Sequence, residues 1–290
     1  MTVRVAGEER LSGGLQGILA HPGGPTQPSV GVLVLAGSSG RVDVERARLL
    51  AREGALALAL RWFGGPGQEP GICEIPLERF IAAIDQLHAA GAQRIGVVGV
   101  SKGAEAALLI ACHDPRISSI VAISPTPVVW ANVGTGADGR AYPYRSSWAW
   151  RDEPLPFVPY DETWVEAPDA AGRVAYRALY EQSLRAFPAA AAEAAIPVET
   201  AQASLLLIAG GSDALWPSGT FAAAIAKRRE LAGRQVEVIT HPEAGHRPYF
   251  PGEAAPEPSA RMAHGGTPEA NAALGRAAWP RMLAHLGLRT

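Results

Sequence analysis

Gly99-Val100-Ser101-Lys102-Gly103 is the stretch that decides the predicted fold. It follows an apolar run over residues 94–100 and opens an alanine-rich run over 103–112, which predicts a strand, a tight turn and a helix in that order. In a nucleophile elbow, glycines two residues before and after the serine keep side chains away from the neighbouring strand and helix. We therefore expect the Ser101 hydroxyl to lie exposed at the edge of a sheet.

Composition narrows the class of protein. The 290-residue chain is long enough for one large domain, and 48% of its residues are hydrophobic. A formal net charge of −2 gives no broad attraction to nucleic acid or to an anionic membrane. The two cysteines, Cys73 and Cys112, do not suggest a disulfide framework. Without a signal-like N-terminus or an apolar run of roughly 18 residues, we expect a cytoplasmic protein with no membrane insertion and no nucleic-acid partner.

Short runs rich in Val, Ile and Leu alternate with helical stretches, which is typical of βα units and a mostly parallel sheet. The expected strands are 15–20, as an early edge strand, and 30–35, 55–60, 95–100, 117–123, 204–209 and 236–240. The expected helices are 44–53, 76–90, 103–112, 220–232 and 268–285, the last kinked or split by Pro280. We predict a single α/β domain over 1–290, with a mostly parallel central sheet flanked by helices.

About 80 residues separate the strand that ends near 123 from the one that begins near 204, far more than a usual connection. They hold 11 of the chain's 19 aromatic residues. We predict an aromatic-rich cap insertion over 127–195, above a pocket for an apolar or extended substrate. Alternatively, these aromatics form a core for the insertion itself. The residues expected to line the pocket are Trp62, Phe63, Trp130, Trp148, Trp150, Tyr160, Trp216 and Tyr249.

A serine hydroxyl needs a base within reach and a carboxylate to orient that base. Asp213 follows the strand 204–209 and His246 follows the strand 236–240, so both are expected at the sheet edge where active sites gather. The order Ser101, Asp213, His246 is that of α/β-hydrolases. Asp213 could instead shape a turn or cap a helix.

His241 and His264 compete with His246 for the role of base, and the glycine before His246 favours it. The other histidines lack the spacing of metal ligands, so no metal and no cofactor are expected.

An oxyanion hole needs two backbone N–H donors. The first is expected from Lys102, which follows the serine. The second is expected from Ser38 or Ser39, in the loop after the strand 30–35, and the pattern does not choose between them. The alternative for this loop is a phosphate cradle, but Gly-Ser-Ser-Gly-Arg fits neither GxGxxG nor GxxxxGK[ST].

Several motifs together resemble the catalytic domain of acyl-CoA thioesterases and bile acid-CoA:amino acid N-acyltransferases, within the dienelactone-hydrolase-like α/β-hydrolases. The matching segments are 74–78, 99–105, 196–199, 210–218, 244–246 and 265–272. The resemblance implies that Ser101 takes the acyl group from a thioester, that His246 relays the proton and that Asp213 orients His246. Acyltransferase members carry cysteine at the nucleophile position, so Ser101 favours hydrolysis.

Animal members of this family also carry an N-terminal β-sandwich domain, and we expect it to be absent here because only about 30 residues precede the first core strand. Arg41, Arg145, Arg151 and Arg247 could hold a phosphate, or they could be surface or ion-pair residues. The expected partner is therefore a small acyl thioester or ester, and the carrier could be CoA, an acyl-carrier protein or something smaller.

Two competing hypotheses remain. One is an acyltransferase, amidase or cyclising ester catalyst that uses the same triad. The other is a non-catalytic ligand-binding protein on a hydrolase fold. The oligomeric state, monomer or homodimer, stays open.

Overall fold

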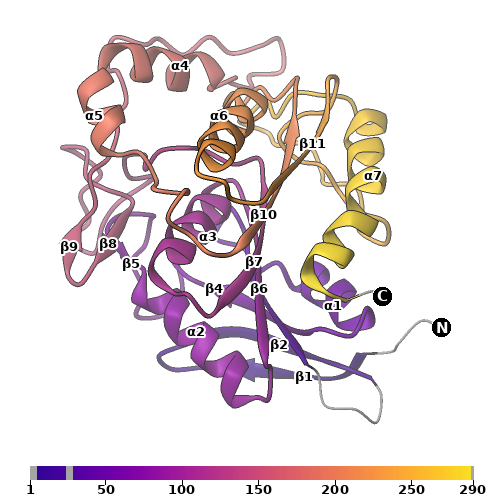
Figure 1. Cartoon of the computed structure of the whole chain (residues 1–290). Helices are drawn as coiled ribbons and strands as arrows, with labels where there is room; N and C mark the ends of the chain where they lie inside the picture. The colour runs from indigo at the N-terminus through magenta and orange to yellow at the C-terminus, as the bar shows by residue number, and fades with distance from the viewer. Residues whose placement is uncertain (1–4, 24–28, 289–290) are drawn as a thin grey trace.

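An eight-stranded sheet forms the centre of the computed structural model, which describes residues 5–23 and 29–288 (Figure 1). From edge to edge its strands are β1 (Val5–Leu11), β2 (Gln16–Pro22), β4 (Leu56–Arg61), β3 (Val30–Leu35), β6 (Arg94–Val100), β7 (Ile117–Ile123), β10 (Ser204–Gly210) and β11 (Val236–His241). The strands from β4 to β11 are parallel, whereas β2 is antiparallel to both of its neighbours. After β3 the chain goes to β4 on one side and then returns to β6 on the other. The strand order therefore reverses between β3 and β6, where open α/β sheets bind ligands.

Helices cover both faces of the sheet (Figure 1). On one face lie α1 (Val44–Arg52) and α7 (Pro268–Leu286), and on the other lie α2 (Glu78–Ala89), α3 (Lys102–His113) and α6 (Ser218–Leu231). Successive side chains of a strand point to opposite faces. Accordingly, Val32 and Val34 of β3 join the apolar core under α1 and α7, while Leu33 and Leu35 join the core under the other helices.

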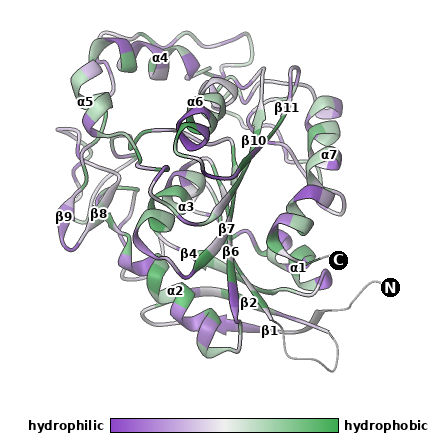
Figure 2. Cartoon of the chain, in the orientation of Figure 1, coloured by the Kyte–Doolittle hydropathy of each residue, from purple (hydrophilic) through white to green (hydrophobic). Residues whose placement is uncertain are grey.

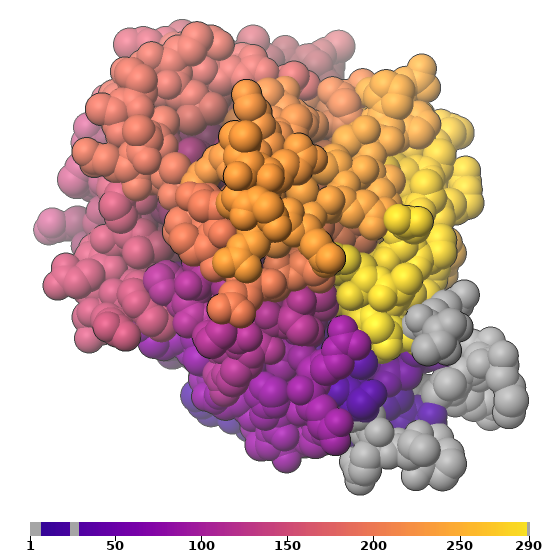
Figure 3. Space-filling view, viewed as in Figure 1, coloured from indigo at the N-terminus to yellow at the C-terminus, as the bar shows by residue number. Residues whose placement is uncertain are grey.

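The segment between β7 and β10 builds a smaller second layer. It contains β8 (Trp148–Trp150), β9 (Glu153–Pro154), α4 (Arg177–Ala186) and α5 (Pro188–Glu193). β8 pairs with β9 and with the short strand β5 (Ile75–Pro76), which ties the segment to the chain before α2. Figure 3 shows the segment, in pink to salmon, packed beside α6 in orange.

The predicted architecture, a mostly parallel sheet flanked by helices, is confirmed, with two differences. The strand expected at the edge is β2, and β1 lies outside it. β1 was not predicted because Glu8, Glu9 and Arg10 are exposed, so the strand has no apolar face to detect (Figure 2). α7 runs through Pro280 as one helix and is not split there, since Pro280 lies on its exposed side. Within the described ranges, no helix combines the length and apolarity needed to cross a bilayer.

Candidate active site

Ser101 occupies a sharp turn between β6 and α3. Its φ of 55° and ψ of −120° lie where non-glycine residues are rarely found. The turn is held because the Ser101 N–H donates to the carbonyl of Ile123 (2.9 Å). A Cβ at Gly99 would overlap the carbonyl oxygen of Gly103, and one at Gly103 would overlap that of Ala36. The local structure is therefore the expected elbow, and its two glycines are required by close backbone packing.

The loop over residues 36–40, which follows β3, lies against Ser101. A Cβ built on Gly37 would be 3.2 Å from the Ser101 Cβ and 3.8 Å from its Oγ. Ser38 is half-buried, whereas Ser39 is exposed and its Oγ accepts from the backbone and side chain of Arg41 (both 3.4 Å). The loop follows β3, and the first turn of α3 follows β6. Both therefore lie next to Ser101, at the point where the strand order of the sheet reverses.

Asp213 and His246 come together beyond the ends of β10 and β11. Nδ1 of His246 lies 2.7 Å from Oδ2 of Asp213, and both side chains are almost fully buried. The other oxygen of Asp213 accepts the backbone N–H of Leu215 (2.9 Å). Because an ionised carboxylate only accepts hydrogen bonds, Nδ1 must carry the hydrogen. Nε2 of His246 then presents a lone pair.

That Nε2 atom is buried and has no hydrogen-bond partner in the part of the chain that the structure describes. The Ser101 hydroxyl does not reach it here, and catalytic hydrogen bonds are often long before substrate binds. Because Asp213 orients the imidazole through Nδ1, Nε2 of His246 is free to accept a proton from a hydroxyl that comes within reach. The arrangement is chemically suited to general-base activation of Ser101.

Two residues that the sequence did not single out hold the loop of His246. The Ser124 hydroxyl, just after β7, donates to the His246 carbonyl (2.9 Å), and Ser124 has a φ of 49°. The side-chain oxygen of Asn271, in the first turns of α7, accepts the N–H of Gly245 (2.7 Å). Asn271 lies in the segment 265–272 that carried the family resemblance, so that motif was its signal. Nothing in the local pattern marked Ser124.

The two competing histidines have other surroundings. His264 passes beside the site: its carbonyl accepts the His246 N–H (2.8 Å), and the two rings are 6.0 Å apart. Burial, with repulsion from His246 and Arg247, lowers the pKa of His264 to about 4. His241 ends β11, and its Nδ1 accepts the N–H of Glu243 (3.2 Å). Of the three, His246 is the one whose ring contacts a carboxylate.

The side chain of Lys102 turns away from the serine into a buried polar cluster. Its Nζ donates to Oε2 of Glu105 (2.9 Å) and to the Ser147 hydroxyl (2.8 Å). Oε1 of Glu105 accepts the backbone N–H of Trp130 (3.0 Å) and the indole N–H of Trp148 (2.8 Å). Burial lowers the pKa of Lys102, and Glu105 opposes that effect. The cluster joins the elbow helix to the segment between β7 and β10.

Among the aromatics expected in the pocket, Trp216 makes a ring contact with a residue of the candidate triad. Its ring meets that of His246 edge-on at 5.6 Å, and its indole N–H donates to the carbonyl of Ser124 (3.1 Å). Phe63 is buried beside Gly40 of the loop 36–40. These two aromatics adjoin the residues around Ser101, and their contact with substrate stays a prediction.

The other predicted pocket aromatics have varied positions. Trp62, Trp130 and Trp148 are buried in the main apolar core, to which the segment 127–195 contributes Trp130 and Trp148. Tyr160 is stacked 6.2 Å from Trp130, and Trp150 stacks on His113 at 4.3 Å. The Tyr249 hydroxyl donates to the carbonyl of Pro268 (3.2 Å).

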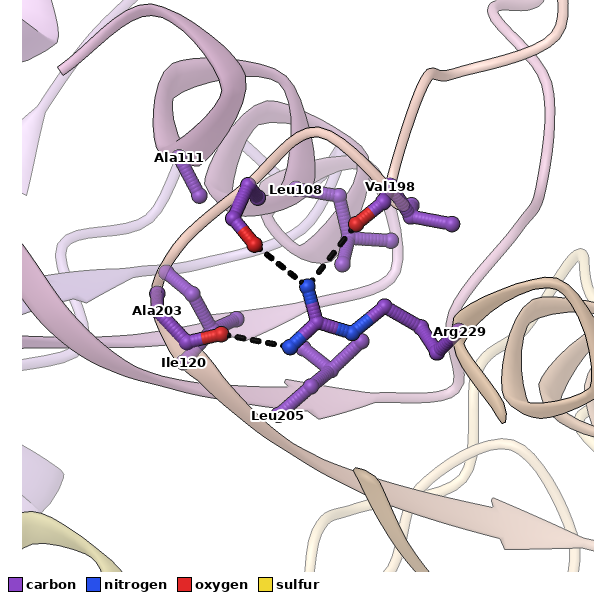
Figure 4. A pocket seen from close by; sticks show the side chains of 8 residues that line it. Leu108, Ala111, Ile120, Val198, Ala203, Leu205 and Arg229 are labelled. Atoms are coloured by element: carbon purple, nitrogen blue, oxygen red, sulfur yellow. Dashed lines mark hydrogen bonds between the residues drawn. The ribbon is translucent and has the colours of Figure 1, made fainter. Parts of the chain in front are cut away.

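A small cavity lies between α3, β7, β10 and α6, away from Ser101. Its volume is about 10 Å³, enough for at most one water molecule. Figure 4 shows the guanidinium of Arg229 reaching into it, with hydrogen bonds to the carbonyls of Val198, Ala201 and Ala203 (2.9, 2.6 and 2.6 Å). This cavity is too small for an acyl group. Among the described residues, no group of three or more His, Cys, Asp and Glu side chains is placed to hold a metal ion.

Solved structures with this fold include a dienelactone hydrolase-like promiscuous phosphotriesterase from metagenomic libraries. The TM-score is 0.56 at 16% identity, and the match covers 99% of this chain and 98% of the other. A puromycin-hydrolysing peptidase of Mycobacterium tuberculosis matches with a TM-score of 0.55 at 15% identity, over 97% of this chain and 38% of the peptidase. These likenesses establish the α/β-hydrolase fold.

Two mammalian proteins are more similar to this chain in sequence than these solved structures are. Mitochondrial acyl-coenzyme A thioesterase 2 of Mus musculus is 28% identical over 265 residues, which are 88% of this chain and 54% of the relative. Acyl-coenzyme A amino acid N-acyltransferase 2 of Rattus norvegicus is 29% identical over 251 residues, 84% of this chain and 55% of the relative. The chain therefore spans about half the length of the curated relatives that it matches.

Residues 75–288 match the family described as BAAT / Acyl-CoA thioester hydrolase C terminal. The match begins at β5 and includes Ser101, Asp213 and His246. It confirms the resemblance that the motifs around these residues indicated. The chain belongs to the BAAT / acyl-CoA thioester hydrolase C-terminal family, on an α/β-hydrolase fold.

Proposed function

We propose that the protein is a serine hydrolase that cleaves acyl thioesters through an acyl-serine intermediate. The main support is the buried hydrogen bond between Asp213 and His246, which leaves Nε2 of His246 without a partner among the described residues, together with the strained turn of Ser101. Family membership supports thioester chemistry, since relatives are named as acyl-coenzyme A thioesterases.

In the proposed reaction, Oγ of Ser101 attacks the thioester carbonyl carbon and its proton passes to Nε2 of His246. Asp213 stabilises the resulting imidazolium. The tetrahedral intermediate collapses with cleavage of the carbon–sulfur bond, and His246 returns the proton to the leaving sulfur as a free thiol. Water, deprotonated by His246, then attacks the acyl ester. The carboxylic acid leaves and Ser101 regains its proton.

For the oxyanion hole we propose the backbone N–H groups of Lys102 and Ser38. The Lys102 N–H lies in the first turn of α3, where no carbonyl of the helix can accept it. Ser38 is favoured over Ser39 because it directly follows Gly37, which lies against Ser101, and because it is the more buried of the two. We also propose that the segment 127–195 acts as a cap over the bound acyl group.

The experiment that tests the function is free-thiol release from acyl-CoAs of short, medium and long chain. We expect release by the wild type, and a loss on the order of 10⁴-fold in Ser101→Ala because the nucleophile is gone. The matched control is Ser29→Ala, an exposed serine just before β3, at the sheet edge opposite Ser101, that should keep full activity. Unchanged thiol release in Ser101→Ala would contradict the proposal.

The rat relative, named as an amino acid N-acyltransferase, supports one alternative, transfer of the acyl group to an amine. Adding glycine to the same assay distinguishes the two: hydrolysis predicts free acid at every glycine concentration, and transfer predicts an N-acyl amino acid. Acyl-carrier protein as the thiol carrier and a cytoplasmic location stay predictions.

A further inference from the structure

Two arginines adjoin the candidate active site from opposite sides. Arg247 directly follows His246 in the chain. Arg41 directly follows the loop 36–40, whose Gly37 lies against Ser101. The two arginines are 206 positions apart in the chain, yet the charge of Arg41 acts on that of Arg247. The fold therefore brings two positive side chains near each other, next to the segments that hold Gly37 and His246.

The other two arginines that the sequence offered for a phosphate are engaged elsewhere. Arg145 pairs with Glu74 (3.4 Å) and Asp138 (3.0 Å). Arg151 is exposed, and its guanidinium lies over the ring of Trp150 at 5.5 Å. These contacts satisfy both side chains without a ligand.

Arg41 and Arg247 have no such compensation. Within residues 5–23 and 29–288, neither guanidinium has a carboxylate oxygen within 4.0 Å. Arg41 donates to the Ser39 hydroxyl (3.4 Å), and Arg247 donates to the carbonyl of Glu257 (3.1 Å). Both acceptors are neutral. Arg41 is exposed, so water hydrates its charge, whereas Arg247 is half-buried, and neither charge is neutralised by a carboxylate of the described residues.

The surroundings of Arg247 disfavour its charge as long as no anion neutralises it. Arg247 is half-buried, and burial followed by repulsion from Arg41 lowers its pKa. His264, beside Arg247, stays neutral above about pH 4, so it can offer a ring N–H without adding a third charge. An anion between the guanidiniums would relieve the repulsion, and guanidinium groups match the geometry of phosphate and carboxylate.

We propose that Arg41 and Arg247 bind an anionic oxygen group carried by the substrate, either a phosphate of the thiol carrier or a carboxylate on the acyl group. The inference deepens the proposed thioester hydrolysis and rests on it: it makes the preferred substrate a negatively charged thioester. Because the two arginines lie on the loops of the oxyanion hole and of His246, the bound anion would also hold these loops in place.

Binding to a Ser101→Ala protein tests the proposal without turnover. The ligands are butyryl-CoA, neutral butyryl-pantetheine and glutaryl-pantetheine, whose acyl group ends in a carboxylate, and the measurement is calorimetric titration. The variants are Arg41→Gln and Arg247→Gln, singly and together. The matched control is Arg276→Gln, an exposed arginine on α7 without a carboxylate partner in the described ranges.

If the anion is a carrier phosphate, the double variant should bind butyryl-CoA about tenfold or more weakly and butyryl-pantetheine unchanged. If it is an acyl carboxylate, the same loss should appear with glutaryl-pantetheine instead. In either case the loss should shrink at high salt, and the control should match the Ser101→Ala parent.

The proposal would be overturned if the double variant bound all three ligands as tightly as the Ser101→Ala parent does. An equal loss for all three, including the neutral ligand, or no binding of any ligand to the parent would also overturn it. Failure of the proposed function has a separate signature, the absence of thiol release by the protein with Ser101 intact.

Discussion

At Ser124 a single hydroxyl links two distant parts of the site. The residue is fully buried, its Oγ donates to the carbonyl of His246, and its own carbonyl accepts the indole N–H of Trp216. Its φ of 49° is costly for a serine, and such conformations persist where the surrounding contacts enforce them. We infer that Ser124 positions the imidazole of His246 from the backbone side.

Ser124→Ala should therefore affect both stability and turnover. The carbonyl of His246 would lose its buried donor, which should lower the free energy of unfolding by about 1–2 kcal/mol. A shifted His246 should lower kcat about tenfold or more with little change in KM. Urea unfolding and steady-state kinetics measure the two effects. Ser119→Ala is the control, since Ser119 is buried on β7 and its hydroxyl has no partner among the described residues.

His264 should make stability depend on pH. Its pKa is lowered from the usual 6.5 to about 4 in the folded protein, so between these pH values the unfolded chain binds a proton that the folded His264 does not. Stability should thus fall as pH falls from 6.5 towards 4. In His264→Gln this part of the fall should be absent. Urea unfolding at several pH values measures it, and parallel curves for the two proteins would contradict the assignment.

Residues at strand ends were the most predictable part of the site. Ser101, Asp213 and His246 each follow an apolar run, and parallel strands bring their carboxyl ends to one edge. Ser124 and Asn271 were not predictable in the same way, because their roles depend on contacts with a loop more than twenty residues away. The catalytic roles of the first three remain predictions that kinetics must test.

Among the elements, α3 has an unusual environment for a helix that opens with Lys-Gly-Ala-Glu. Residues 102–111 are all buried, since the sheet covers one side and the segment between β7 and β10 covers the other. The pair Lys102–Glu105 lies at this junction, where Glu105 accepts from Trp130 and Trp148. A buried ion pair of this kind costs desolvation free energy, and removing one partner leaves the other charge uncompensated.

Lys102→Met should lower the free energy of unfolding by about 3–5 kcal/mol, because Glu105 would stay buried without its cation. The double variant Lys102→Met with Glu105→Gln should recover much of that loss, since Gln keeps an acceptor oxygen for the two tryptophans. Urea unfolding of wild type, Lys102→Met, Glu105→Gln and the double variant forms the double-mutant cycle. A double variant no more stable than Lys102→Met would show that the charge pair is not the reason for the loss.

Strands were predicted correctly where both of their faces are buried, and they were missed where the strand is exposed. β3, β6 and β10 read as continuous apolar runs because both faces are covered. β1 has exposed charged residues, and β9 has only two residues, both exposed. Such strands depend on pairing with a neighbour, which a local pattern cannot show.

At the scale of the whole molecule, Arg229 of α6 ties together the segments that lead into the neighbouring strands β10 and β11. Its guanidinium donates to the carbonyls of Val198, Ala201 and Ala203 and to that of Gln235, just before β11. Arg229 is 1% exposed, and burial lowers its pKa. These contacts lie at the N-terminal ends of β10 and β11, far from Ser101. We therefore expect Arg229 to contribute to stability and not to catalysis.

Arg229→Lys should lower the free energy of unfolding by about 2–4 kcal/mol, because one ammonium cannot reach four carbonyls held in fork geometry. The kcat of the folded fraction should be unchanged. Thermal unfolding and kinetics below the transition measure both. Arg228→Lys is the control: among the described residues, half-exposed Arg228 pairs with Glu199 alone, so this variant should lose about 1 kcal/mol or less.

The strained turn at Ser101 also implies a trade-off between the proposed activity and thermal stability. A serine held at a φ of 55° is strained, and glycine adopts that conformation without the penalty. Selection for thermal tolerance alone would therefore favour glycine at position 101 and discard the proposed nucleophile. A serine at this position lowers the stability of the fold, and the nucleophilic role proposed for Ser101 accounts for that cost.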